Sequence, residues 1–267
     1  MKILAINASY RGDQGYTRFL VDKLLAGAGA AGAECEVVTL AHKKINRCLA
    51  CDKCQQSGKN YLICVQRDKD DVQDIFRKMA SSDLIIFGTP VYVVGISVLL
   101  KMLLDRQYGT ADCGKLIISK SGLIFHESDR KISGKPIVAL ICCDNIEDET
   151  PRSLIQYFKD YAKFLDVPLA GVLVRNAGRA AGHGKDKMRE QFFPKLAQVY
   201  KAFEQAGREL ATQGYISKAT QRKANQEIVP MKNFKRLKKT MPYKEQILQH
   251  ARTQMILAEA SSAPDKT

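Results

Sequence analysis

The sequence lacks any stretch of about 20 apolar residues, the length that a helix needs to cross a membrane. It begins with a short apolar run, Met1 to Asn7, that is shorter than the apolar core of a signal peptide. It also has no internal repeat and no low-complexity tract. From these absences we expect a cytoplasmic protein without a membrane span.

Acidic residues are scarce relative to basic ones. The 267 residues include 28 Asp and Glu against 42 Lys and Arg, so the net charge is +14. Such a charge favours anionic partners without identifying them. The chain also has eight cysteines. Because disulfides are rare in the cytoplasm, we expect these cysteines to be metal ligands, redox groups or small core residues.

Five short apolar runs alternate with helical patterns along the chain. The expected strands are residues 2–7, 35–40, 83–88, 136–141 and 171–174. The third run is apolar enough to be buried on both faces, as central parallel strands are. The expected helices begin at Thr17, cover residues 72–80 and 97–106, follow Pro151, and end near Gly214. The pattern predicts an α/β fold with a doubly wound sheet of five parallel strands.

Two segments depart from this alternation. Residues 107–134 form a long connection in which residues 116–118 could make a short strand, and such loops are often lids or interfaces. Residues 215–267 form a basic tail with eleven Lys or Arg and four Asp or Glu. In this tail one helical face is predicted from Tyr243, Ile247, Leu248, Ala251 and Met255. We therefore divide the chain into a domain of residues 1–214 and a C-terminal extension of residues 215–267.

The loop after the first strand has the composition of a phosphate site. Ser9 and Thr17 supply hydroxyls, Arg11 supplies a guanidinium, and Gly12 and Gly15 leave backbone N–H groups accessible beside a helix start. The loop matches neither the nucleotide P-loop nor the dinucleotide fingerprint. The alternative interpretation is an ordinary polar loop with a helix-capping residue.

The exit of the third strand carries a second pattern. It reads Gly-Thr-Pro-Val-Tyr from Gly88, and Leu-Lys and Asp-Arg pairs follow at 100–101 and 105–106. Together with the first loop, this stretch resembles the NADPH-dependent FMN reductase group of flavodoxin-like proteins, and most of all the iron–sulfur flavoproteins. The resemblance covers about residues 1–210 and excludes the tail. It implies a flavodoxin-like fold, an FMN cofactor and NAD(P)H as an electron donor.

The resemblance also implies roles for individual residues. Those expected at the FMN phosphate are Ser9, Arg11, Gly15, Tyr16 and Thr17, and those expected along the flavin ring are Pro90, Val91, Tyr92 and Gly95. Tyr10 stands where the family has Pro, and Tyr16 stands where it has Asn or Ser. Tyr92 could instead be a buried aromatic residue at a strand end. A third loop at residues 143–145 is expected near the ring.

Residues 42–66 contain a compact cysteine cluster. Cys48, Cys51 and Cys54 are followed by Cys64, with a spacing of C-x2-C-x2-C-x9-C. A run of this kind can hold three corners of a [4Fe–4S] cluster while a more distant thiol holds the fourth iron. Structural zinc favours two separated pairs, so zinc is the weaker metal alternative, and reduced thiols without metal are another. The gap before Cys64 is longer than in the iron–sulfur flavoproteins that the chain resembles.

Together these features predict an FMN-dependent oxidoreductase coupled to a [4Fe–4S] cluster for electron transfer. The donor is NAD(P)H or a ferredoxin-type protein, and a small molecule or protein is the electron acceptor. No protein side chain is expected to act as a catalytic acid or base. The alternatives are an NAD(P)H-dependent FMN or quinone reductase without a functional cluster, and a non-enzymatic electron carrier. The resemblance suggests a homo-oligomer, and we expect no specific nucleic-acid partner because the basic tail has no interleaved aromatics and no recognised binding motif.

Overall fold

The computed structural model describes residues 1–56, 62–185, 193–229, 249 and 253. Its central sheet has five parallel strands in the order β2-β1-β3-β6-β7. The strands are β1 (Lys2–Asn7), β2 (Glu34–Thr39), β3 (Leu84–Pro90), β6 (Ile137–Cys142) and β7 (Leu169–Arg175). This is the flavodoxin-like order, so the predicted fold class is confirmed. The predicted helical face between residues 243 and 255 lies outside the described residues.

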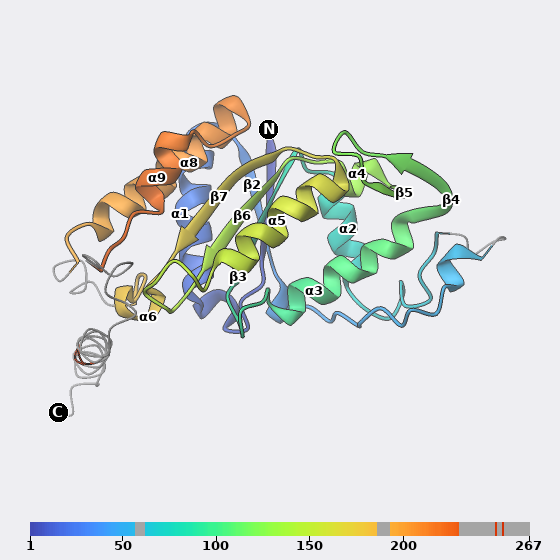
Figure 1. Ribbon diagram of the computed structural model, residues 1–267, viewed down its shortest axis with the longest axis horizontal. Coiled ribbons are helices and arrows are strands. Elements are labelled where there is room, and N and C mark those ends of the chain that lie inside the picture. Colours follow the sequence, from blue (N-terminus) through green and yellow to red (C-terminus); the bar gives the residue numbers. More distant parts are fainter. Residues whose placement is uncertain (57–61, 186–192, 230–248, 250–252, 254–267) are drawn as a thin grey trace.

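Helices cover both faces of this sheet (Figure 1). One face carries α1 (Tyr16–Ala30) and α8 (Leu196–Gln213). The other carries α2 (Val72–Ala80), α3 (Val98–Asp105) and α5 (Arg152–Leu165). Successive β3 residues alternate between the two cores, with Ile86 on the α1 side and Phe87 on the other. Among the described residues, no helix has the length and apolar character that crossing a membrane requires.

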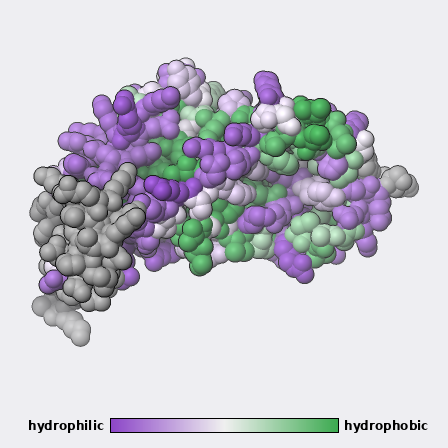
Figure 2. Space-filling model, in the orientation of Figure 1, coloured by the Kyte–Doolittle hydropathy of each residue, from purple (hydrophilic) through white to green (hydrophobic). Residues whose placement is uncertain are grey.

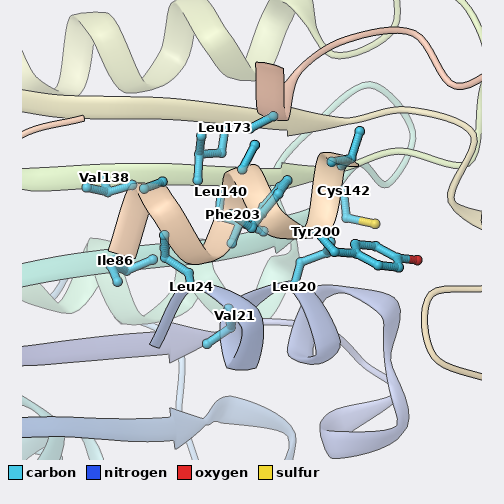
Figure 3. Close-up of a cluster of buried hydrophobic side chains, with 14 of the residues drawn as sticks. Leu20, Val21, Leu24, Ile86, Val138, Leu140, Cys142, Leu173, Tyr200 and Phe203 are labelled. Carbon is cyan, nitrogen blue, oxygen red and sulfur yellow. The ribbon is translucent and has the colours of Figure 1, made fainter. Parts of the chain in front are cut away.

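The backbones of helices α1 and α8 approach each other closely at two glycines. A Cβ at Gly27 would lie 1.8 Å from the carbonyl oxygen of Glu204, and one at Gly207 would lie 1.8 Å from that of Leu24. Only glycine fits at these two contacts. Figure 3 shows the apolar side chains that fill the space between the two helices and the sheet, among them Leu24 and Phe203. This packing fixes α1, and with it the loop that precedes α1.

The long connection of residues 107–134 forms a unit of its own. It contains β4 (Ala111–Ile118) and β5 (Ile124–Ser128), which pair as an antiparallel hairpin, between the short helices η4 (Arg106–Thr110) and α4 (Arg130–Ser133). The sequence indicated only residues 116–118 as a strand. The longer β4 escaped detection because its register shifts between Asp112 and Leu116, so the apolar alternation is interrupted.

The chain after α8 continues to pack on the sheet. Helix α9 (Lys218–Ala224) lies along β7, where the side-chain amide of Gln221 accepts from Val172 N at 3.0 Å and that of Asn225 accepts from Val174 N at 2.7 Å. These amides pair with an edge strand that would otherwise expose its backbone. Residues 215–229 therefore join the folded unit, while the division of the chain at residue 214 stays a prediction. The remaining elements are η1 (Gly12–Gln14), η2 (Leu40–His42), η3 (Lys53–Gln55) and α6 (Gly178–Ala181).

Candidate functional site

The loop between β1 and α1 is held in a fixed shape by short-range hydrogen bonds. The buried side chain of Asn7 donates to the carbonyl oxygen of Gly12 at 3.1 Å and accepts from Ser9 N at 3.3 Å. Ser9 Oγ accepts from Arg11 N at 3.2 Å. Gly12 has a φ of +55°, which favours glycine. Ser9 is thereby fixed at the carboxyl end of β1, where ligands bind in open α/β sheets.

The first turn of α1 is suited to an anion. Gly15 is its N-cap residue, and no side chain caps the helix start. The first backbone N–H groups of a helix carry partial positive charge and favour a phosphate. Thr17 lies buried in this turn. Gly88 of β3 lets the helix come this close, because a Cβ there would be 2.9 Å from Val21 Cγ2 and 3.2 Å from Thr17 Cγ2.

The loop after β3 ends in a tight two-residue turn. Tyr92 and Gly95 exchange backbone hydrogen bonds of 3.0 and 2.9 Å around Val93 and Val94. Both valines have positive φ, of 47° and 61°, which is unfavourable for β-branched residues and marks a strained turn. Ser153 Oγ donates to the carbonyl oxygen of Val94 at 2.6 Å and holds the turn against α5. Val93 is fully exposed at its tip.

The loops after β1 and β3 meet at one pocket. Its lining consists of Ser9, Arg11, Tyr16, Thr17, Pro90, Val91, Tyr92, Cys142 and Asp144. Seven of these nine were singled out from the sequence, and the structure brings them together. Gly15 and Gly95, the two other predicted residues, shape the loops beside the pocket rather than line it. That these residues bind FMN stays a prediction.

Aromatic rings and cations surround the mouth of the pocket. The rings of Tyr10 and Tyr92 are stacked with centroids 4.6 Å apart, and Tyr10 is half exposed. Arg11 lies 5.5 Å and Lys185 Nζ 5.6 Å from the centroid of the Tyr16 ring. Tyr16 therefore holds two positive charges beside the pocket through cation–π contacts. The sequence placed Tyr16 at the FMN phosphate but did not predict its contacts with Arg11 and Lys185.

Cys142 and Asp144 line the pocket from the end of β6 and were not among the predicted site residues. Their position follows from the strand order, which places β6 beside β3. Burial raises the pKa of the Cys142 thiol to about 12, and the charge of Asp144 adds to this effect. Cys142 is therefore a neutral thiol at pH 7. The only hint in the sequence was the expected third loop at residues 143–145.

The cysteine loop, residues 47–69, is closed at its neck by a buried ion pair. Asp70 accepts from Asn46 N at 3.0 Å and from the guanidinium of Arg106, which also donates to the carbonyl oxygen of Asn46 at 3.0 Å. The side chains of Arg106 and Asp70 are 2% and 0% exposed. Gln66 Nε2 donates to the carbonyl oxygen of Arg47 at 2.6 Å. The two ends of the loop are thus joined to each other and to the end of α3.

Two of the four predicted ligands, Cys54 and Cys64, lie close together inside this loop. Burial raises the pKa of the Cys54 thiol, and the neighbouring thiols of Cys64 and Cys48 raise it further, against a hydrogen bond from Gln55. Cys54 and Cys64 both lie against Gly109, where a Cβ would be 4.0 Å from Cys54 Sγ and 3.5 Å from Cys64 Cβ. Cys51 is exposed.

Four thiols form the donor set that an iron–sulfur cluster requires, so the residues fit this group chemically. Within the described ranges, which omit residues 57–61 of the loop, no three His, Cys, Asp or Glu side chains are arranged around a common metal position. The metal role of Cys48, Cys51, Cys54 and Cys64 therefore stays a prediction.

The family model for NADPH-dependent FMN reductase matches residues 1–178. The chain belongs to this family. Among curated proteins, it is 42% identical to an iron–sulfur flavoprotein of Methanocaldococcus jannaschii over 107 residues, which are 40% of this chain and 52% of that protein. An iron–sulfur flavoprotein of Archaeoglobus fulgidus is 34% identical over 107 residues, 40% of this chain and 49% of the relative. The matches thus span about half the length of these relatives.

Solved structures of flavin-dependent enzymes have a similar fold. One is an FMN-dependent NADH-azoreductase of Bacillus anthracis, solved in complex with FMN, with a TM-score of 0.55 at 15% identity. The superposition covers 79% of this chain and 99% of the azoreductase chain. The azoreductase AzrA has a TM-score of 0.53 at 15% identity, covering 80% and 100%. At this identity the likeness establishes the flavodoxin-like fold, and the resemblance to the family read from the two loops is confirmed by the family match.

Proposed function

We propose that this member of the FMN reductase family is an FMN-dependent oxidoreductase that binds the flavin in the pocket between the β1 and β3 loops. The observation that carries the proposal is the convergence of seven sequence-predicted residues on one pocket at the start of α1. FMN has a single phosphate group, and this pocket has one anion-binding helix start. The azoreductase of similar fold was solved with FMN.

The chain's own residues divide the work of binding. The hydroxyls of Ser9 and Thr17 and the first N–H groups of α1 hold the phosphate, and Arg11 and Lys185 neutralise its charge. Pro90, Val91 and Tyr92 lie along the flavin ring, and the stack of Tyr92 on Tyr10 keeps that side of the site rigid. When bound, FMN supplies hydride acceptance and one-electron release, with NAD(P)H as the donor.

The cysteine loop holds a [4Fe–4S] cluster in this proposal, through Cys48, Cys51, Cys54 and Cys64. Support comes from the four-thiol donor set, from the position of Cys54 and Cys64 side by side against Gly109, and from two relatives described as iron–sulfur flavoproteins. The loop's closed neck holds the ends of the ligand segment before any metal binds. Electrons would then leave the protein one at a time through the cluster.

A second candidate is a reductase of the same family without a cluster. It is favoured by the absence, among the described residues, of three metal-ligating side chains arranged around one point. In that case the cysteines are reduced thiols.

One preparation separates these candidates. The protein is purified anaerobically, the released flavin is identified by mass, and iron, acid-labile sulfide and zinc are measured per chain. We expect FMN together with about four iron and four sulfide, the content of one [4Fe–4S] cluster. FAD as the main flavin, or no flavin affinity, contradicts the proposed pocket, whereas FMN without iron supports the second candidate.

A matched pair of variants tests the ligand set. Cys64→Ser should retain FMN but should lose iron, because only three thiolates are left to hold the four irons. Cys35→Ser on β2 should change neither the FMN content nor the iron content. Full iron content in Cys64→Ser removes Cys64 from the ligand set. The oligomeric state, the absence of a specific nucleic-acid partner and the cytoplasmic location also stay predictions.

A further inference from the structure

A second cavity lies between the β4–β5 hairpin and helices α3 and α5, and it has a volume of about 500 Å³. It shares no lining residue with the flavin pocket. Most of its wall is apolar or aromatic, contributed by Leu104, Leu116, Ile124, Phe125, Tyr157, Tyr161, Phe164 and Leu165. Cavities of this size and character commonly hold small organic molecules.

The aromatic side chains of the wall are already arranged in pairs. Phe125 of β5 and Phe164 of α5 have ring centroids 5.0 Å apart, and Tyr157 and Tyr161 of α5 are stacked at 6.1 Å. Rings held in this way offer faces and edges to another planar ring. The surface around the hairpin is hydrophobic as well, as Figure 2 shows, with Leu116 66% and Ile124 68% exposed. Such a patch on a protein surface usually marks a binding site.

Two polar atoms in the wall have no hydrogen-bond partner within the described part of the chain. Tyr161 OH donates to Gln107 Oε1 at 2.6 Å, so this contact fixes the amide and leaves its nitrogen Nε2 buried and unpaired. His126 Nδ1 is buried and unpaired as well. A buried donor without a partner is destabilising, and a ligand carbonyl oxygen at Gln107 Nε2 would remove that cost.

The charges around the cavity favour an uncharged ligand. Asp105 is the only formally charged side chain among the lining residues that the structure describes, and it is paired with Lys101. Burial raises the pKa of Tyr157 to about 12, so its phenol is neutral at pH 7. A charged molecule would lose its hydration here without gaining a counterion.

We propose that this cavity binds an uncharged aromatic carbonyl compound, with its ring against Phe125 and Phe164 and a carbonyl oxygen accepting from Gln107 Nε2. The site is independent of the flavin and of the metal content of the cysteine loop. It nevertheless borders that loop, because Tyr108 on its rim donates to Asp52 at 3.1 Å. A compound bound here therefore lies beside the segment that carries the cysteines.

The probe for this site is 2,3-dimethyl-1,4-naphthoquinone, whose two methyl groups block reaction with thiols. It is titrated by calorimetry into the oxidised, FMN-saturated full-length protein, so that the flavin pocket is already filled. We expect saturable binding of one molecule per chain. Gln107→Leu should weaken it about tenfold, the effect of one lost hydrogen bond. Gln73→Leu, an exposed site on α2, should leave it unchanged.

A ligand-side control keeps the test independent of how a variant folds. The hydrocarbon 2,3-dimethylnaphthalene has the same rings without carbonyls, and it should bind wild type about tenfold more weakly than the quinone does. In Gln107→Leu the two compounds should bind alike. The absence of saturable binding overturns the proposal. This holds also if binding fails because a second copy of the chain covers the cavity. Binding lost in Tyr92→Ala but kept in Gln107→Leu overturns it too, because the compound then lies at the flavin.

Discussion

Gly15 offers a sharp test of the proposed phosphate loop, because a Cβ at this position would collide with the Ser9 side chain. The residue has φ −81° and ψ 151°, which any amino acid can adopt. A Cβ there would lie 2.4 Å from Ser9 Oγ and 3.0 Å from Ser9 Cβ. Gly15→Ala must therefore displace the Ser9 side chain, which accepts from Arg11 N at 3.2 Å and faces the pocket.

The expected size of the effect follows from the bond that is lost. The proposed hydrogen bond from Ser9 to the FMN phosphate would be charge-assisted and would contribute about 1.5–3 kcal/mol. Losing it should raise the Kd for FMN roughly 10-fold to 150-fold. Gly29→Ala is the matched control in the same helix, because a Cβ there meets nothing within 4 Å. It should leave the FMN affinity unchanged and raise the free energy of unfolding by about 1 kcal/mol through helix propensity.

The assay is the quenching of FMN fluorescence on titration with each apoprotein, alongside thermal unfolding. A Ser9→Gly background completes the cycle, because it removes the two nearest atoms that the new Cβ would meet and leaves only the carbonyl oxygen of Gly12, at 3.3 Å. In that background Gly15→Ala should cost little further affinity. Wild-type FMN affinity in Gly15→Ala, or equal losses in Gly15→Ala and Gly29→Ala, would refute this account of the loop.

Three other predictions concern stability. Arg106→Met leaves the buried carboxylate of Asp70 without its ion-pair partner. Urea denaturation should therefore show a loss of about 3–5 kcal/mol in the free energy of unfolding. A loss below about 1 kcal/mol would contradict the role of this ion pair at the neck of the cysteine loop. Burial raises the pKa of Cys142 from its ordinary value of 9.0 to about 12, so its stabilising contribution is complete below pH 9. That contribution should fall with rising pH between 9 and 12 by up to about 1.4 kcal/mol per pH unit, and Cys142→Ser should remove this part of the slope. Truncation after Gly214 should give a lower unfolding temperature than truncation after Val229, because it also removes α9 and its bonds to β7. Equal temperatures for the two truncations would contradict the role given to α9.

The sequence by itself determined the five strands and the two loops that meet at the pocket. Strands such as β3 are buried on both faces, so their apolar runs are unbroken and easy to recognise. The loop after β1 was equally clear, because a phosphate site needs small residues, hydroxyls and a helix start within a few positions of one another. Residues that are close in the sequence can thus reveal a local site without knowledge of the fold.

Only the tertiary structure decided what depends on contacts between distant segments. Cys142 and Asp144 join the pocket because β6 lies beside β3, and Arg106 reaches Asp70 across 36 positions of the sequence. The pairing of α9 with β7 and the cavity under the β4–β5 hairpin arise in the same way. Strand order, burial and pKa shifts depend on which residues are neighbours in space. A periodic pattern along the chain indicates the element to which a residue belongs, but it does not indicate which other element packs against it.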